Sequence, residues 1–164
     1  MKFNLPSILI IGASIIYFFL MIYALKRKTK QEVVSLSWLL AATTIWSFFY
    51  GLEVASTNLS TMKLLNTLSY LGLAPVTVLW FIFAERYCEN DKYLRSFNTK
   101  LLFIVPLFTI IMVATNDLHH LYYSSVELAS SGIYSFRKTE PGFFFFFHVV
   151  YSHLFLFFGI VLFI

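Results

Sequence analysis

The 164-residue sequence is 59% hydrophobic and 20% aromatic, and only 12% of its residues are charged. A soluble domain carries about 25% charged residues, so the composition excludes one, and lipid must be the solvent for much of the surface. The formal charge of +4 gathers in loops and forms no nucleic-acid-binding patch. The single cysteine, Cys88, excludes an internal disulfide and a multi-cysteine metal site.

Five apolar segments reach or approach the length of about twenty residues that a membrane-spanning helix needs. We expect such helices at residues 5–25, 34–55, 64–84, 101–115 and 143–164. The segment 101–115 is the shortest, and polar residues set its end. In all five segments the apolar residues are continuous rather than alternating with polar ones, which argues against strands. The sequence therefore predicts an all-α, polytopic membrane helix bundle that forms a single domain over residues 1–164.

Lysine and arginine are distributed unequally between the two sides of this bundle. One side holds eight of them: Lys26, Arg27, Lys28, Lys30, Arg86, Lys92, Arg95 and Lys100. The opposite side holds four: Lys2, Lys63, Arg137 and Lys138. Because basic residues favour the cytoplasmic side, we expect the N-terminus to lie outside. The fifth span then ends at the cytoplasmic face without a charged anchor, so we expect the chain to continue beyond Ile164.

The long outer loop, residues 116–142, is the main polar segment. Ser130, Ser131 and Gly132 predict a turn between two short strands. Since 27 residues cannot build a core of their own, we interpret this loop as a lid on the outer mouth of the bundle.

Polar residues recur on one face of several predicted helices. Trp46, Tyr50 and Glu53 lie at i, i+4 and i+7, Asn66 and Tyr70 are four apart, and His148, Tyr151 and Ser152 stack on the last helix. Polar groups in a membrane normally face the bundle interior. We therefore expect a ligand- or signal-sensing cavity in the outer half, lined by candidates from this set: Trp46, Tyr50, Glu53, Asn66, Tyr70, His148 and Tyr151.

A structural interpretation of the same residues stays open. Glu53 ends an apolar run near the outer headgroups, where its carboxylate can reach water at modest cost. The tyrosines then serve as interfacial belt residues, and His148 as a hydrogen-bonding group in helix packing.

Other kinds of site find little support. His148 and His153 are five residues apart, so one straight helix cannot aim both at one metal ion. The Glu85-Arg86-Tyr87 sequence resembles an acid-Arg-Tyr motif of rhodopsin-like receptors, but one cysteine cannot form the disulfide of those receptors. No nucleophile–base pair or phosphate-binding loop is evident. We predict no catalytic residue, no metal and no cofactor.

The order of several motifs resembles the N-terminal seven-helix sensor region of bacterial histidine kinases. The stretches are WLLAATTIWSFFYGLEVAS, LSTMKLLNTLSYLGLAPVTVLWFIFAERY, LLFIVPLFTIIMVATNDLHHLYY and GFFFFFHVVYSHLF. The outer loop ends Glu140-Pro141-Gly142, the reverse of the Gly-Pro order of the family. The matching positions are Trp46, Glu53, Tyr70, Gly72, Pro75, Trp80, Arg86, Tyr87, Pro106, Asn116, His119, His120, Gly142, His148 and Tyr151.

This resemblance implies a sensory input module without catalytic activity of its own, multi-pass in the cell's inner (plasma) membrane. It implies two further helices beyond Ile164, then a dimeric cytoplasmic output that autophosphorylates with ATP and acts on a response regulator. An unknown signal or small ligand would shift helix packing. Pro75 and Pro106 each remove a helix hydrogen bond, so they are candidate pivots or static kinks.

Three alternatives remain. One is a small-solute transporter, which would carry ionisable groups at the membrane midplane. Another is the input module of a membrane diguanylate cyclase, an output that some relatives carry. A third is a quinone- or haem-binding membrane enzyme that uses His148.

Overall fold

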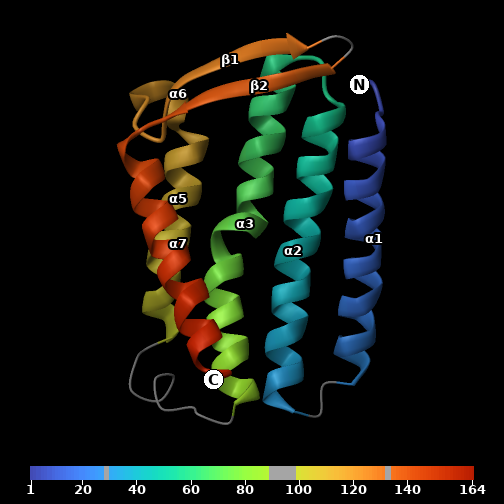
Figure 1. Cartoon of the computed structure of the whole chain (residues 1–164), viewed down its shortest axis with the longest axis vertical. Helices are drawn as coiled ribbons and strands as arrows, with labels where there is room; N and C mark the ends of the chain where they lie inside the picture. Colours follow the sequence, from blue (N-terminus) through green and yellow to red (C-terminus); the bar gives the residue numbers. More distant parts are fainter. Residues whose placement is uncertain (28–29, 89–98, 132–133) are drawn as a thin grey trace.

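The computed structural model describes residues 1–27, 30–88, 99–131 and 134–164. The elements in chain order are α1 (Leu5–Lys26), α2 (Gln31–Ala55), α3 (Leu59–Tyr87), the 3₁₀ helix η1 (Thr99–Phe103), α5 (Ile104–Ala114), α6 (Asn116–His119), β1 (Tyr123–Ser131), β2 (Tyr134–Pro141) and α7 (Phe143–Val161). The long helices stand side by side, and the β1–β2 hairpin lies across the end of the bundle near the N-terminus (Figure 1). The C-terminus lies at the opposite end (Figure 1).

The predicted helix bundle is confirmed, and four helices among the described residues are long and apolar enough to cross a membrane: α1, α2, α3 and α7. Large apolar side chains on these helices point outward: Phe19, Trp38 and Phe157 are each at least 60% exposed. A membrane accounts for this surface, because water would make its exposure costly. The chain is thus a multi-pass membrane protein.

The fourth predicted span, residues 101–115, differs from the other four. Its α-helical part, α5, has 11 residues, about 16 Å at 1.5 Å per residue. The preceding 3₁₀ helix adds five residues, about 10 Å at 2 Å per residue. Together they approach the thickness of the hydrocarbon layer, about 30 Å. The segment therefore begins at Thr99, earlier than predicted, and ends at Ala114.

The other boundaries also shift from the predicted ones. Helix α2 begins three residues earlier, at Gln31, and α3 runs from Leu59 to Tyr87 rather than over 64–84. Asn58 caps α3, because its side chain accepts hydrogen bonds from the backbone N–H groups of Ser60 and Thr61. Helix α7 ends at Val161, before the predicted residue 164. Of the predicted cytoplasmic basic residues, Lys28, Lys92 and Arg95 lie outside the described residues.

Helices α2 and α3 approach each other closely at Gly72. A Cβ atom there would lie 2.5 Å from the backbone nitrogen of Trp46 and would also collide with the carbonyl oxygen of Ala42. Only glycine fits this crossing without moving a backbone. The backbones of α2 and α3 therefore pack directly against each other at this crossing.

The two prolines predicted as candidate pivots, Pro75 and Pro106, act locally in different ways. Pro75 lies inside α3, whose ribbon bends near its middle (Figure 1). Pro106 lies in the first turn of α5, where η1 gives way to the α-helix. Since proline has no N–H, the carbonyl of Leu102 receives no α-helical hydrogen bond from position 106. The Tyr151 hydroxyl donates to this carbonyl instead, at 2.6 Å.

The outer loop contains the two predicted strands. They pair antiparallel, with Leu128 opposite Arg137 and Ser131 opposite Tyr134, while Gly132 of the predicted turn lies outside the described residues. Beneath the hairpin lies a buried cluster of Tyr70, Ala74, Met112, Val113, Tyr122 and Tyr123. This core ties the hairpin to α3, α5 and α7.

Candidate functional site

Arg137 of β2 is the centre of the polar site beneath the hairpin. Its side chain is 12% exposed. Its Nε lies 2.9 Å from Oε1 of Glu53, and its Nη2 lies 2.7 Å from Oδ1 of Asn66. The guanidinium also lies over the Tyr123 ring, 5.0 Å from the centroid, a cation–π arrangement. One hairpin residue thus binds α2, α3 and β1.

These neighbours stabilise the charged form of Arg137. Burial by itself would lower the pKa of its guanidinium, but the negative charge of Glu53 and the contact with Tyr123 outweigh that effect and raise the pKa. Arg137 therefore stays a cation, which makes it a permanent partner for Glu53.

Glu53 lies in the last turn of α2 and is 7% exposed, so its carboxylate does not extend into water. Its Oε1 accepts from Arg137, whereas its Oε2 is buried without a hydrogen-bond partner among the described residues. Glu53 borders a cavity of about 360 Å³ between the N-terminus, α2 and the hairpin. The lining residues are Asn4, Pro6, Tyr50, Glu53, Val54, Ser135, Phe136 and Arg137.

A second polar cluster links the hairpin to α3 and α7. The Tyr122 hydroxyl donates to the Tyr70 hydroxyl at 3.1 Å and lies 2.9 Å from Nδ1 of His148. Which of Tyr122 and His148 donates the second bond depends on the imidazole tautomer. Tyr70 is bonded in turn to the Tyr123 hydroxyl at 2.9 Å. Burial raises the pKa of Tyr122, so its hydroxyl stays protonated.

Tyr123 joins the two clusters, since its ring contacts Arg137 and its hydroxyl contacts Tyr70. A continuous set of contacts therefore runs from Glu53 through Arg137, Tyr123, Tyr70 and Tyr122 to His148. It crosses α2, β2, β1, α3 and α7.

The turn that carries these tyrosines is built by Asn116 and His119. Oδ1 of Asn116 accepts from the backbone N–H groups of Tyr122 and Tyr123, and its Nδ2 donates to the Tyr123 carbonyl. Nδ1 of His119 accepts from the Leu121 N–H, and His120 has a positive φ of 54°. The Asn-x-x-His-His motif thus orients the start of the hairpin.

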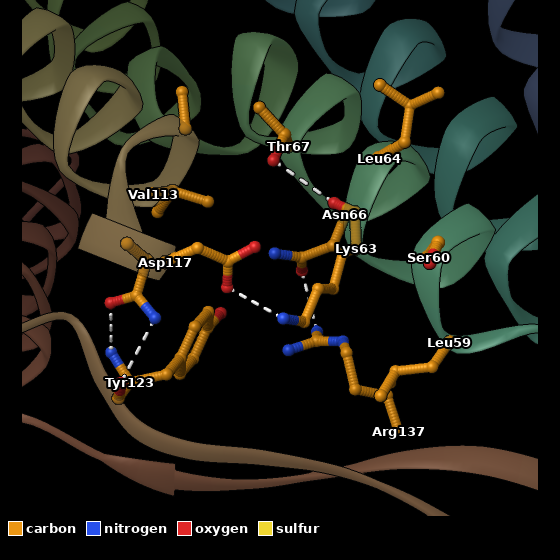
Figure 2. A pocket seen from close by; sticks show the side chains of 12 residues that line it. Leu59, Ser60, Lys63, Leu64, Asn66, Thr67, Val113, Asp117, Tyr123 and Arg137 are labelled. Atoms are coloured by element: carbon orange, nitrogen blue, oxygen red, sulfur yellow. Dashed lines mark hydrogen bonds and ion pairs between the residues drawn. The ribbon is translucent and has the colours of Figure 1, made fainter. Parts of the chain in front are cut away.

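A cavity of about 390 Å³ opens beside Arg137, between α3 and the α5–α6 corner (Figure 2). At its edge Nζ of Lys63 lies 2.7 Å from Oδ1 of Asp117. Figure 2 shows Arg137 and Tyr123 from the hairpin facing the same space. The lining residues are Leu59, Ser60, Lys63, Leu64, Asn66, Thr67, Val113, Ala114, Asn116, Asp117, Tyr123 and Arg137.

The predicted site residues do not all line one cavity. Glu53 and Asn66 meet at Arg137, while Tyr70 and His148 meet at Tyr122. Tyr50 borders the smaller cavity beside Glu53.

Two of the predicted candidates lie elsewhere. Tyr151 does not join the set, because its hydroxyl bonds the Leu102 carbonyl that Pro106 leaves free. Trp46 contributes to the close α2–α3 crossing at Gly72.

Sequence reasoning missed Arg137, Tyr122 and Tyr123 as site residues. A usable signal existed for Arg137: a buried carboxylate requires a cation, and the outer side offers only Lys2, Lys63, Arg137 and Lys138. The two tyrosines had no comparable signal, because their direction depends on the turn that Asn116 stabilises.

Comparison with known proteins agrees with this architecture. A family model described as the N-terminal 7TM region of histidine kinase matches residues 9–164. No curated protein and no solved structure matches the chain. The match covers nearly the whole sequence and confirms the resemblance inferred from the motifs. The chain belongs to the family of N-terminal seven-transmembrane regions of histidine kinases.

Proposed function

We propose that the chain is the sensory input module of a sensor histidine kinase. In this proposal the hairpin end faces the outside of the plasma membrane and receives a signal, and the helices relay it to a cytoplasmic output. The observation that carries the proposal is the contact of Arg137 with both Glu53 and Asn66. A change at the hairpin cannot leave α2 and α3 unaffected while that contact exists.

The relay follows from the cost of buried charge. If the hairpin moves, Arg137 and Glu53 separate, and each buried charge must find water or a new partner. Intermediate positions are therefore unfavourable, and the bundle has two preferred arrangements rather than a continuous range. The tyrosine cluster carries the same displacement to α7 through His148. Pro75 would be a pivot in α3 between the two arrangements.

The family supports a proposal for the output and the partners. The full-length parent would dimerise through its cytoplasmic domains, autophosphorylate with ATP and transfer phosphate to a response regulator. A coding sequence that continues beyond Ile164 with two apolar spans and a kinase domain would support this. A cyclase domain would instead change the output while leaving the sensory role in place.

The test uses the full-length parent in membrane vesicles, with basal autophosphorylation as the readout. Glu53→Gln and Arg137→Gln remove the two ends of one ion pair, so both should shift autophosphorylation in the same direction while membrane insertion persists. Lys138→Gln is the matched control, because Lys138 neighbours Arg137 but its side chain is exposed. If both test variants autophosphorylate as the wild type does, the ion pair has only a structural role, and the proposal is overturned.

A further inference from the structure

We propose that the cavity of about 390 Å³ beside Arg137 binds a small organic carboxylate with a short apolar tail. The ligand carboxylate would lie between Lys63 and Arg137, and the tail would lie against the apolar wall. This inference rests on the proposed sensory function and names the class of signal for it.

The size and position of the cavity suit a small ligand. Ligand pockets generally measure about 300–1,000 Å³, and this one lies within that range. Its walls come from α3, the α5–α6 corner and the hairpin (Figure 2). A ligand there would touch the hairpin and α3, which are two of the parts that the proposed relay connects.

The two cations of the cavity differ in how tightly they are held. Arg137 is buried and oriented by Glu53 and Asn66. An arginine offers five N–H donors, of which those two partners take one each. Its direction is therefore already set before a ligand arrives, which lowers the entropic cost of binding.

Lys63 is the adaptable cation. Its partner Asp117 is exposed, with side-chain exposures of 35% for Lys63 and 66% for Asp117. An exposed ion pair contributes little to stability, so Lys63 can turn to a ligand carboxylate at low cost. Asp117 would then face the ligand and favour one that also carries an ammonium group.

The remaining wall is apolar. Leu59, Leu64, Val113, Ala114 and the Tyr123 ring line the same cavity. Burying a tail of three or four carbons against this wall strengthens binding through the hydrophobic effect, which the two cations alone would not supply. The combination fits an aliphatic carboxylate or an aliphatic amino acid better than an inorganic anion.

The experiment measures binding to the whole 164-residue chain in lipid nanodiscs by calorimetry. The probes are 4-methylpentanoate, L-leucine, and the uncharged 4-methylpentanamide. We expect the two carboxylates to bind at least about tenfold more tightly than the amide, since a charge-assisted hydrogen bond contributes that much. Tighter binding of leucine than of 4-methylpentanoate would identify an amino acid as the source of the carboxylate, and the reverse a simple acid.

Two variants and one control locate the site. Lys63→Gln should weaken carboxylate binding about tenfold, and Ala114→Phe should abolish it by filling the cavity from an exposed position. The control is Lys138→Gln, which also removes one positive charge. Lys138 lies on the hairpin but does not line the cavity, so this variant should bind carboxylates as the wild type does. Circular dichroism melting confirms that each variant is folded.

Equal affinity for carboxylate and amide, binding of neither, or wild-type affinity in both Lys63→Gln and Ala114→Phe would overturn the inference. Since the assay records no phosphorylation, such a failure leaves the proposed sensory function intact. Conversely, if autophosphorylation is unchanged in the Arg137 and Glu53 variants, the proposed sensory function fails, but the binding constant measured for the cavity still stands.

Discussion

Arg137 and Glu53 form a buried ion pair, with 2.9 Å between Nε and Oε1, across 84 residues of sequence. Another ion pair at the same end, Lys63–Asp117, is largely exposed. The two pairs have similar distances but different surroundings. Their contributions to stability should therefore differ widely, and this difference can be measured.

Glu53→Gln or Arg137→Gln alone should lower the free energy of unfolding by about 3–5 kcal/mol, because each leaves a buried charge without its partner. The double variant should lose less than the sum of the two. Lys63→Gln, the exposed control, should lose at most about 1 kcal/mol. Unfolding by SDS in mixed micelles, followed by circular dichroism, measures all four. Additive losses in the double variant would contradict a direct pairing.

High pH should destabilise the tyrosine cluster. Burial raises the pKa of Tyr122 above its ordinary value of 10.0, so its contribution is complete below pH 10 and is lost as the pH rises toward the folded-state pKa. Between pH 8 and pH 11 the stability advantage of the wild type over Tyr122→Phe should shrink by about 1.4 kcal/mol. The same unfolding assay at both pH values measures it. A constant difference would show that Tyr122 titrates as an exposed tyrosine does, and a growing one that folding lowers its pKa.

Much of the fold could be predicted from the sequence because it depends on local properties. Apolar length predicts the four long helices, and Ser130 and Ser131 lie where the hairpin strands approach their turn. The span that contains α5 was harder to predict, because part of it is a 3₁₀ helix, which rises further per residue than an α-helix does. A fifteen-residue run that looks too short for a span gains length from η1.

The candidate site could be predicted only in part. Helical spacing and the expected orientation predict that Glu53 and Asn66 lie in the outer half, but their meeting point depends on which hairpin residues face inward. That direction is set by the strand register and by the turn at Asn116, neither of which is a periodic pattern. The position of Tyr151 outside the two polar clusters could not be predicted for a different reason. Its hydrogen-bond partner is the backbone carbonyl of Leu102, which side-chain patterns do not reveal.

Gly72 should tolerate no side chain. A Cβ atom would collide with the backbones of Ala42 and Trp46, so Gly72→Ala should lower the free energy of unfolding by about 1–3 kcal/mol. Gly12→Ala is the matched control, because a Cβ atom there meets nothing within 4 Å. It should be neutral or stabilising by up to about 1 kcal/mol through helix propensity. Equal effects of the two substitutions would rule out close α2–α3 packing.

Tyr151 and Pro106 should be energetically coupled through the Leu102 carbonyl. Tyr151→Phe removes the hydroxyl that bonds this carbonyl and should lower the free energy of unfolding by about 1 kcal/mol, because a partly buried acceptor loses its hydrogen bond. Pro106→Ala restores a backbone N–H four residues after Leu102, which can close an α-helical bond to the same oxygen. In the Pro106→Ala background, Tyr151→Phe should therefore cost clearly less.

A double-mutant cycle on the unfolding free energies measures this coupling. Tyr50→Phe serves as the control, since Tyr50 is 44% exposed and lies far along the chain from Pro106. Its cost should be small and the same in the wild type and in the Pro106→Ala variant. If Tyr151→Phe costs as much in the Pro106→Ala background as in the wild type, the hydroxyl does not replace the missing helix bond. The 3₁₀ turn before α5 would then need another cause.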